Sequence, residues 1–337
     1  MKLSGFLLII LFSTQAYAQK ADFDHIDFHK ADSIALGYKN EDLDNLPELA
    51  HKLTTNLDTD VERFRAIYMW VCTNINNDYG LYAKNKRKRE KLKTDTVKLQ
   101  AWNQTVTKTV LIKLLKNKKT ICTGYAYLLK TLSNLANLEC EMIHGYGRTS
   151  TTKMADLETP NHSWNATKIE GKWYLSDPTW ASGLENPVSK LKKLDYIEGF
   201  FLADPRLFAV NHYPVEKQWW LLKERFPSFE TFKNGPILYG KAYRNLSLHL
   251  APIKLHNLVN KYETINFKYE LDLSLNAQDL RFEIDDGYER KTVTPRLTLN
   301  DGQLVGLEYQ FRFGGFYDLH VFAANDLIAT YTFKVSD

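Results

Sequence analysis

Apolar positions follow two different periods along the chain. Around residues 59–75 and 122–138 they recur at three- and four-residue steps, which is the spacing of helices with one buried face. From about residue 264 to the C-terminus, apolar and polar residues alternate in short runs separated by Gly, Asn and Asp turn signals. We therefore expect an α+β fold, in which a mixed first domain is followed by a β-sandwich.

The first helix signal begins at Thr59. Glu62 lies three residues later, and this pair predicts a capping box, in which each side chain bonds the other residue's backbone N–H. The apolar residues that follow form one stripe: Val61, Phe64, Ile67, Tyr68, Val71 and Ile75. We expect this helix to belong to the core and to carry no catalytic group.

A second helix is predicted after Cys122. Its buried stripe consists of Ala126, Leu128, Leu129, Leu132, Leu135 and Leu138. Thr120 is its expected N-cap, and Gly124 is expected to let another chain or a substrate come close. In the first turn, free backbone N–H groups favour a thiolate, which is the nucleophilic form of cysteine. Position alone leaves two interpretations of Cys122 open, a nucleophile and a small buried apolar residue.

A hairpin is predicted farther along, with the turn at Glu170-Gly171. If Ile169 pairs with Lys172, His162 and Asp177 become diagonal neighbours on one face of the hairpin. A carboxylate at that separation can hold the imidazole in one tautomer.

The other imidazole nitrogen would then be free to take a proton from Cys122. The sequence thus contains a candidate nucleophile in Cys122, a base in His162 and an orienting acid in Asp177. The alternative is a surface hairpin with an incidental His and Asp.

Three blocks of sequence carry a resemblance to a known family. They are Ile121-Cys122-Thr123-Gly124-Tyr125-Ala126, His162-Ser163-Trp164-Asn165 and Gly171-Lys172-Trp173-Tyr174-Leu175-Ser176-Asp177-Pro178-Thr179-Trp180. Together they resemble the transglutaminase-like superfamily, and within it most closely the kyphoscoliosis peptidase type. The resemblance covers about residues 58–222 and implies a papain-like core in which Cys122, His162 and Asp177 have the three roles above. Asn77 stands where that family usually has tyrosine, which weakens the match at this block.

Other residues are weaker candidates for the site. The long connection over residues 80–117 is expected to help build the substrate groove. Trp102 or Gln104 could donate to a developing oxyanion, but the spacing favours neither. His144 competes with His162 for the role of base, although no register gives it an acidic partner. His212 is expected to be structural, packed among aromatic neighbours.

The composition and the first 18 residues indicate the cellular compartment of the protein. The 337 residues are 44% apolar and 25% charged, as in ordinary globular proteins. Met1-Lys2, an apolar run over Phe6–Phe12 and Ala16-Tyr17-Ala18 predict a signal peptide that is cleaved before Gln19. We therefore expect an exported protein, periplasmic or secreted, with no transmembrane anchor.

The net charge and the number of cysteines further narrow the possible classes of protein. The formal charge is +4, and it falls to +3 without residues 1–18 because Lys2 is their one charged side chain. This near balance does not indicate nucleic-acid binding, and the basic run at residues 84–93 is expected to be a solvated surface. Three cysteines are an odd number, so at least one thiol is free or pairs outside the chain, and a Cys72–Cys140 disulfide stays open.

The sequence therefore predicts four segments. They are a signal peptide (1–18), a polar and partly helical lead (19–57), a transglutaminase-like catalytic domain (58–234) and an immunoglobulin-like β-sandwich (235–337). The sandwich is expected either to bind a partner such as a cell-wall polymer or to support the first domain.

The expected activity is thiol-dependent acyl transfer on the amide bonds of a protein or peptide substrate, with hydrolysis preferred. Protein cross-linking and a non-catalytic adaptor on the same fold are the alternatives. No cofactor or metal is expected. His25 and His29, spaced like two ligands on one helix face, lack a third.

Overall fold

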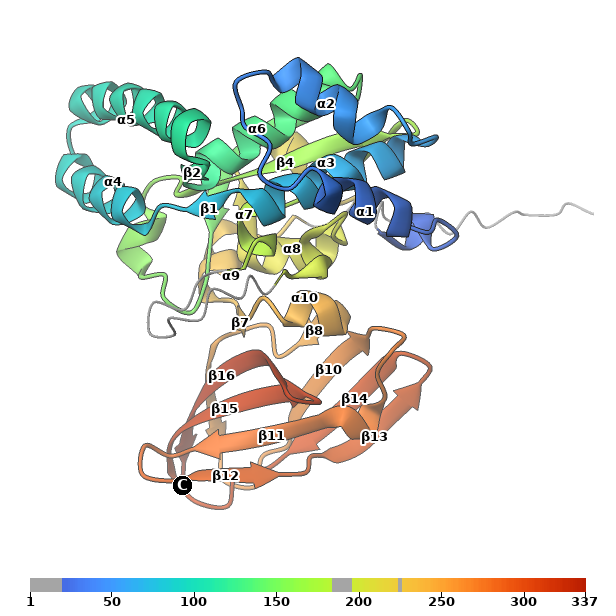
Figure 1. Cartoon of the computed structure of the whole chain (residues 1–337). Coiled ribbons are helices and arrows are strands. Elements are labelled where there is room, and N and C mark those ends of the chain that lie inside the picture. The colour runs from blue at the N-terminus through green and yellow to red at the C-terminus, as the bar shows by residue number, and fades with distance from the viewer. Residues whose placement is uncertain (1–19, 184–195, 224–225) are drawn as a thin grey trace, which may run out of the picture.

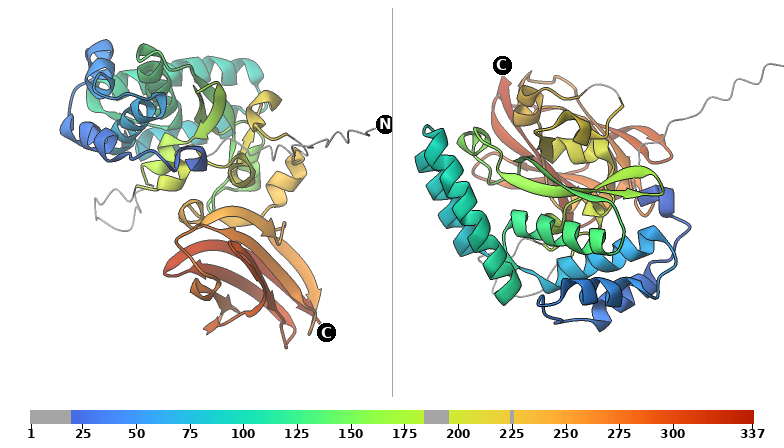
Figure 2. Two further views of the ribbon diagram at one scale, coloured as in Figure 1. Left: turned by 90° about the vertical axis from the view of Figure 1, so that its right-hand side faces the viewer. Right: turned by 90° about the horizontal axis from the view of Figure 1, so that it is seen from above.

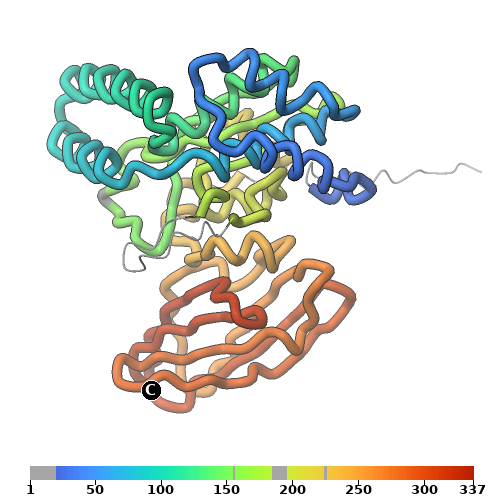
Figure 3. The backbone as a smooth tube through the Cα atoms, in the orientation of Figure 1, coloured from blue at the N-terminus to red at the C-terminus, as the bar shows by residue number. Residues whose placement is uncertain are grey.

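The computed structural model describes residues 20–183, 196–223 and 226–337, and the expected signal peptide lies outside this part of the chain. Two lobes are stacked one above the other (Figure 1). We call residues 20–234 the helical lobe and residues 235–337 the β-rich lobe. The path of the backbone in Figure 3 passes from the first lobe into the second and ends there.

Ten α-helices lie in the described residues, nine of them in the helical lobe. They are α1 (His29–Gly37), α2 (Leu46–Thr54), α3 (Asp60–Asn74), α4 (Tyr79–Leu92), α5 (Thr96–Asn117), α6 (Cys122–Leu135), α7 (Pro178–Ala181), α8 (Pro205–Asn211), α9 (Phe229–Asn234) and α10 (Ala242–Asn245). None of the described helices has the length and apolar character needed to cross a membrane.

A four-stranded antiparallel sheet forms the centre of the helical lobe. Its strand order is β5 (Lys172–Ser176), β4 (His162–Ile169), β3 (Cys140–Gly147) and β6 (His212–Pro214). Helix α6 packs against β3 and β4, and α3 packs against α6. The predicted stripes face this core: Phe64 and Tyr68 on α3 and Leu128 and Leu132 on α6 are fully buried. Leu135, predicted as part of the second stripe, is instead exposed at the last residue of α6. Burial of this apolar surface stabilises the scaffold that carries both ends of the site.

The capping box that was predicted for the first helix is confirmed. The Thr59 hydroxyl accepts from the Glu62 N–H at 3.3 Å, and the Glu62 carboxylate accepts from the Thr59 N–H at 3.0 Å. The predicted hairpin register is also confirmed, since Ile169 pairs with Lys172 across the turn.

Thr120 is not the N-cap of the second helix, contrary to the prediction. It belongs to the short strand β2 (Lys119–Thr120), which pairs in parallel with β1 (Asn76–Asn77). Ile121 is the N-cap residue and makes no side-chain capping bond. A β-carbon on Gly124 would lie 1.9 Å from the Thr120 hydroxyl, so this glycine makes room for a side chain of its own chain.

Residues 80–117 are not an irregular connection but an antiparallel helix pair. Helices α4 and α5 pack against each other and form one edge of the helical lobe, clear of the central sheet (Figure 2, right). Asp78 caps α4 by accepting from the Leu81 N–H, and Asp95 caps α5 by accepting from the Lys98 N–H. The high proportion of polar residues misled the sequence interpretation, because α4 buries only Leu81 and α5 only the narrow stripe of Val106, Val110 and Leu114.

The β-rich lobe contains two sheets that face each other (Figure 2, left). One has the order β13 (Arg296–Asp301), β14 (Leu304–Tyr309), β10 (Ile265–Leu271) and β8 (Leu246–Ala251). The other has the order β12 (Arg290–Val293), β11 (Leu280–Asp285), β15 (Gly315–Ala323), β16 (Asp326–Ser336) and β7 (Ile237–Leu238), and β9 (His256–Asn260) pairs in parallel with β16.

The rings of Phe267 and Phe282 meet between these sheets at 4.7 Å, so the two apolar faces form one core. The alternating run at residues 292–299 is divided between β12 and β13, which lie in different sheets. Pro295 interrupts it, because proline cannot donate to a strand ladder. The expected immunoglobulin-like topology stays a prediction.

The two lobes share a continuous apolar core. The ring of Phe200 in the helical lobe stacks on Tyr243 of α10 at 4.3 Å. The buried Arg148 donates to the Pro236 carbonyl at 2.5 Å, and Asn211 donates to the Leu238 carbonyl at 2.8 Å. The β-rich lobe is therefore packed directly behind the elements that hold the site described next.

Candidate active site

Cys122 is the first residue of α6, as the sequence predicted. The backbone at Ile121 is extended, with φ −113° and ψ 179°, so the chain turns sharply into the helix at the cysteine. The thiol is partly exposed and accepts from the Ser163 N–H on strand β4. Helix and sheet thus meet at this sulfur, where the free N–H groups of the first turn favour negative charge.

His162 lies at the start of β4, between Cys122 and Asp177. Its Nε2 is 2.6 Å from Asp177 Oδ2, and its side chain also hydrogen-bonds Cys122, which leaves Nδ1 as the nitrogen on the thiol side. The ring stacks on Trp180 at 4.7 Å. A β-carbon on Gly147 of the neighbouring strand would come within 2.9 Å of the His162 side chain, so this glycine gives the ring its space.

Asp177 is fully buried and follows directly after β5, where it serves as the N-cap of α7. Its Oδ1 accepts from the N–H groups of Thr179 at 2.9 Å and Trp180 at 3.1 Å. The Tyr68 hydroxyl of α3 donates to the Asp177 carbonyl at 3.1 Å. Capping therefore fixes one carboxylate oxygen and turns the other toward His162.

The protonation states of this group follow from its contacts. Burial on its own lowers the pKa of His162, but the charge of Asp177 and the hydrogen bonds to Asp177 and Cys122 outweigh it and raise the pKa to about 10. Burial raises the pKa of Cys122, and the hydrogen bond and charge of His162 reverse this and lower it. The same neighbours hold the pKa of Asp177 well below its usual range despite its burial. A thiolate and an imidazolium are therefore favoured together near neutral pH.

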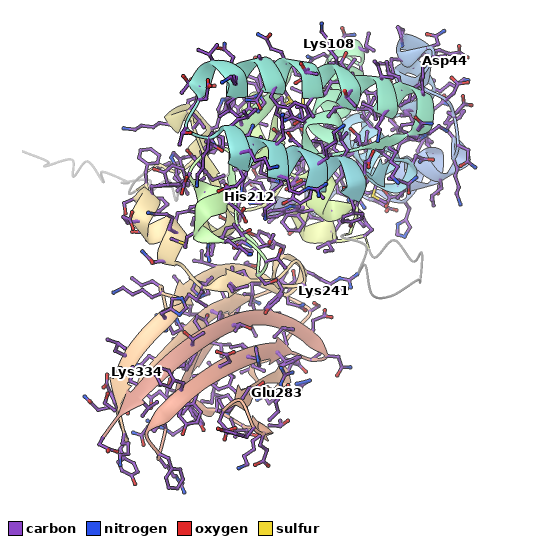
Figure 4. All side chains as sticks on the ribbon, turned by 90° about the vertical axis from the view of Figure 1, so that its left-hand side faces the viewer. Asp44, Lys108, His212, Lys241, Glu283 and Lys334 are labelled. Atoms are coloured by element: carbon purple, nitrogen blue, oxygen red, sulfur yellow. The ribbon has the colours of Figure 1, made fainter. Side chains whose placement is uncertain are left out.

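His212 is a member of the site that the sequence interpretation did not place there. Its Nε2 is 3.1 Å from the same Asp177 Oδ2, and its ring stacks on Phe208 at 3.6 Å. Figure 4 labels this residue in the helical lobe, on the side toward the β-rich lobe. The aromatic packing that was expected is present, but the contact with Asp177 is made across 35 residues and left no sequence signal.

Burial lowers the pKa of His212 to about 4, so its ring is neutral at pH 7. A neutral ring has one N–H, and its Nδ1 lies 3.2 Å from the Phe208 carbonyl. The Asp177 carboxylate is the stronger acceptor, so we place the proton on Nε2. Asp177 then accepts four hydrogen bonds, which is the full capacity of a carboxylate.

His162, Asp177 and His212 also have the residue types of a metal site. Their nearest ligand atoms lie within 4.8 Å of one another and are all buried. These atoms already hydrogen-bond one another at 2.6 Å and 3.1 Å, and an ion bound among them would have to replace both bonds. The facing polar atoms of these three side chains therefore already have hydrogen-bond partners in one another.

A cleft of about 530 Å³ opens on Cys122 and His162. The helix pair α4 and α5 forms one wall, and residues 156–161, which precede His162, form another. His144 and Glu216 also line the cleft. This volume is in the range of binding pockets for small ligands and peptide side chains. Residues 80–117 thus border the cleft, as expected from the sequence, and so does the loop before His162.

The other predicted candidates are placed differently. Trp102 donates its indole N–H to Asn85 at 2.9 Å and does not line the cleft, and Gln104 is exposed on α5. Neither is placed to donate to an oxyanion beside Cys122. His144 lines the cleft, but its Nδ1 contacts the Ser163 hydroxyl at 3.0 Å, and no carboxylate among the residues that the structure describes hydrogen-bonds its ring.

All three cysteines are free. Cys72 is buried on α3 near the Pro178 carbonyl, and Cys140 is buried at the start of β3, where the Thr167 hydroxyl contacts its sulfur at 3.2 Å. The disulfide that was left open is therefore not formed. Burial raises the pKa of both thiols, so Cys122 alone among the three has a lowered pKa. In the lead segment, His29 contacts Asp27 at 2.5 Å and is exposed.

Comparison with known proteins agrees with this arrangement. Residues 47–178 match the family model described as the transglutaminase-like superfamily. The chain is 34% identical over 209 residues to kyphoscoliosis peptidase of Homo sapiens, covering 61% of this chain and 29% of that protein. It is 30% identical over 237 residues to the Mus musculus kyphoscoliosis peptidase, covering 70% and 32%. The chain thus spans about a third of the length of these relatives.

A solved crystal structure of a TGase overlaps 45% of this chain and 32% of its own, at 15% identity and a TM-score of 0.27, which is too low to add to the assignment. The family match and the sequence identities carry it instead. Through residues 47–178 the chain belongs to the transglutaminase-like superfamily and is of the kyphoscoliosis peptidase type.

Proposed function

We propose that this protein is a cysteine-dependent hydrolase of amide bonds in proteins or peptides, with Cys122 as nucleophile, His162 as base and Asp177 as orienting acid. One observation carries the proposal. His162 hydrogen-bonds both the Cys122 thiol and the Asp177 carboxylate, at the inner end of an open cleft. This is the geometry of an activated nucleophile, its base and the group that orients the base.

In the first half of the reaction, the Cys122 thiolate attacks the carbonyl carbon of the amide. The free backbone N–H groups at the start of α6 would stabilise the oxygen that becomes negative. His162 then gives its Nδ1 proton to the departing amine, and a thioester on Cys122 remains. Asp177 keeps the ring oriented throughout by accepting from Nε2.

In the second half, the neutral His162 takes a proton from water, which attacks the thioester and releases the acid. A lysine amine in place of water would give a cross-linked protein by the same chemistry. We favour water because cross-linking requires a second groove for the acceptor protein.

The choice between the two acceptors is testable. The protein is incubated with a glutamine-containing protein substrate and a labelled amine, and both cleavage and amine incorporation are measured. We expect cleavage or deamidation without efficient incorporation. Incorporation that exceeds hydrolysis would replace our proposal by protein cross-linking.

A non-catalytic adaptor on this fold would make no use of an activated thiol. Iodoacetamide should modify Cys122 well below about pH 8.5, the value of a free thiol, and Cys122→Ala should abolish this reaction. Cys72 and Cys140 are matched controls, because both are buried and their pKa values are raised. Equal reactivity of the three thiols would favour the adaptor.

Three further expectations are also proposals. The signal-like pattern of residues 1–18 supports export, and a mature N-terminus at Gln19 would test it. The two facing sheets and the parallel β9–β16 pair support an immunoglobulin-like C-terminal domain beginning near residue 235. We propose that this domain supports the catalytic one or binds a partner such as a cell-wall polymer, which pull-down with isolated cell wall would test.

A further inference from the structure

The charges that line the cleft are unequally balanced. Three basic side chains line it: Lys86, Arg89 and Lys93. Lys86 pairs with Asp156 at 2.8 Å, and Lys93 pairs with Glu90 at 2.9 Å and Glu158 at 3.0 Å. Both lysines are therefore paired with carboxylates of the same cleft, and Lys93 is paired with two of them.

Arg89 has a different set of partners. Its guanidinium donates to Asn103 Oδ1 at 2.8 Å, to Thr159 Oγ1 at 3.0 Å and to the Pro160 carbonyl at 2.6 Å. All three acceptors are neutral, and within the described residues no carboxylate pairs with this arginine. A guanidinium has five N–H donors, so two remain for another acceptor.

The positive charge of Arg89 lies near the residues proposed to react. Its acceptor Pro160 lies two residues before His162, and burial lowers the pKa of Arg89 while the charge of the Cys122 thiolate opposes that effect. The thiolate does not neutralise Arg89, because the His162 imidazolium already balances it. The three hydrogen bonds hold the half-buried side chain in place before any substrate arrives.

Glu216 lines the cleft beside His144, and its carboxylate accepts only from the neutral Gln218 amide within the described residues, at 3.2 Å. This carboxylate repels a carboxylate of the substrate, whereas the guanidinium of Arg89 attracts one. Both Nη2 donors of Arg89 are already used, so the two that remain, on Nε and Nη1, would each bind a carboxylate oxygen through a single charge-assisted hydrogen bond.

We propose that Arg89 is a specificity-determining residue, which binds a carboxylate of the substrate close to the carbonyl that Cys122 attacks. This inference rests on the proposed function for its meaning. The substrate is then an acidic peptide, in which the carboxylate comes from an Asp or Glu side chain or from the C-terminus.

The first test requires no turnover. Iodoacetate and iodoacetamide both alkylate the Cys122 thiolate and release iodide, but only iodoacetate carries a carboxylate. We expect Arg89→Gln to lower the ratio of the two rates by about fivefold, as expected for a unit charge several ångströms away at a partly buried site. Arg89→Lys, which keeps the charge, should retain most of the ratio.

Arg87→Gln is the matched control, since Arg87 is on the same helix, is exposed and lines a separate hollow with Lys84 and Lys88. An unchanged ratio in Arg89→Gln, or an equal fall in Arg87→Gln, would overturn the inference. A general loss of structure would give a different result. It would lower both alkylation rates, and the ratio of the iodoacetate rate to the iodoacetamide rate would approach that of a free thiol in Arg89→Lys as well as in Arg89→Gln.

The second test uses peptides in matched pairs that differ by Glu or Gln at one position, each with a free or an amidated C-terminus. We expect faster cleavage of peptides that carry a carboxylate, and the pair that responds identifies its source. Arg89→Gln should remove this preference. Cleavage without any Arg89-dependent preference would overturn the inference alone, whereas no cleavage together with a changed alkylation ratio would overturn the proposed hydrolysis and leave the inference standing.

Discussion

Two histidines, one in each lobe, have similar aromatic surroundings but opposite protonation. His162 is bonded to Asp177, and its pKa is raised to about 10. His249 on β8 has its Nε2 2.8 Å from the Tyr331 hydroxyl, and burial lowers its pKa to about 4. Desolvation disfavours the charged ring in both places, and only the first has a carboxylate to reverse it. Acid–base capacity therefore depends on the neighbour and not on burial.

His212 shows that the carboxylate supports only one charged ring. It contacts the same oxygen of Asp177 as His162, yet its pKa is lowered to about 4, by burial and by the positive charge of His162. One negative charge is thus shared between a charged and a neutral imidazole. We infer that His162 is the proton carrier and His212 a positioning residue for Asp177.

The largest effect on activity should come from removing the ring of His162, which is the charged one of the two histidines His162 and His249. His162→Ala is expected to lower kcat for peptide hydrolysis by up to about 10⁶-fold, because nothing else activates the thiol or protonates the leaving amine. His249→Ala, in the β-rich lobe, should leave kcat unchanged. Steady-state kinetics of both variants test the contrast, and a comparable loss in the two would mean that the site is misassigned.

The second largest effect on activity should come from removing the charge of Asp177, which is present beside His162 and absent beside His249. Asp177→Asn preserves the shape of the side chain but not its charge, and kcat should fall by about 10⁴-fold. The pKa of His162 should fall and that of Cys122 should rise, so iodoacetamide should react with Cys122 only at higher pH. An unchanged alkylation profile would show that Asp177 does not set the charge of this pair.

A smaller effect is expected at His212. His212→Leu removes one donor to Asp177, so kcat should fall by about tenfold with KM unchanged. The acidic limb of the rate profile should move to higher pH, because Asp177 and the ion pair are less well held. His212→Gln, which keeps an N–H donor, should restore most of kcat. A purely structural role would lower thermal stability in both variants without moving the pH profile.

The smallest effect is on the pH dependence of folding stability, and His249 and His162 change it in opposite directions. Because the folded pKa of His249 is lowered to about 4, the unfolded chain binds more protons below about pH 6.5, and this residue destabilises the fold as the pH falls toward 4. His249→Asn should reduce that loss by at most about 1.4 kcal/mol for each pH unit. Urea unfolding at pH 7 and pH 5 measures the difference.

His162 acts in the other direction. Its folded pKa is raised, so its contribution to stability is complete below about pH 6.5 and is lost as the pH rises through about 10. Unfolding of His162→Gln should therefore differ from the wild type in its alkaline pH dependence. The same alkaline dependence in both proteins would contradict a raised pKa at this residue.

Local sequence signals were reliable where one segment decided the structure. The Thr59 capping box, the helix that begins at Cys122 and the register of the 164–176 hairpin all depend on contacts between residues close in sequence. The polar helices α4 and α5 were missed, because most of their surface faces solvent and only a narrow stripe is buried.

The amino-acid sequence by itself determined the fold class, the family and the three residues proposed for catalysis, since each has a local pattern and a characteristic set of neighbours. Only the tertiary structure decided that His212 contacts Asp177, that the Trp102 indole donates to Asn85 and that Arg89 lines the cleft and pairs with no carboxylate of the described residues. These contacts join segments between 14 and 71 residues apart. Which polar group meets which across such distances depends on how helices and sheet pack, and no periodicity along the chain records it.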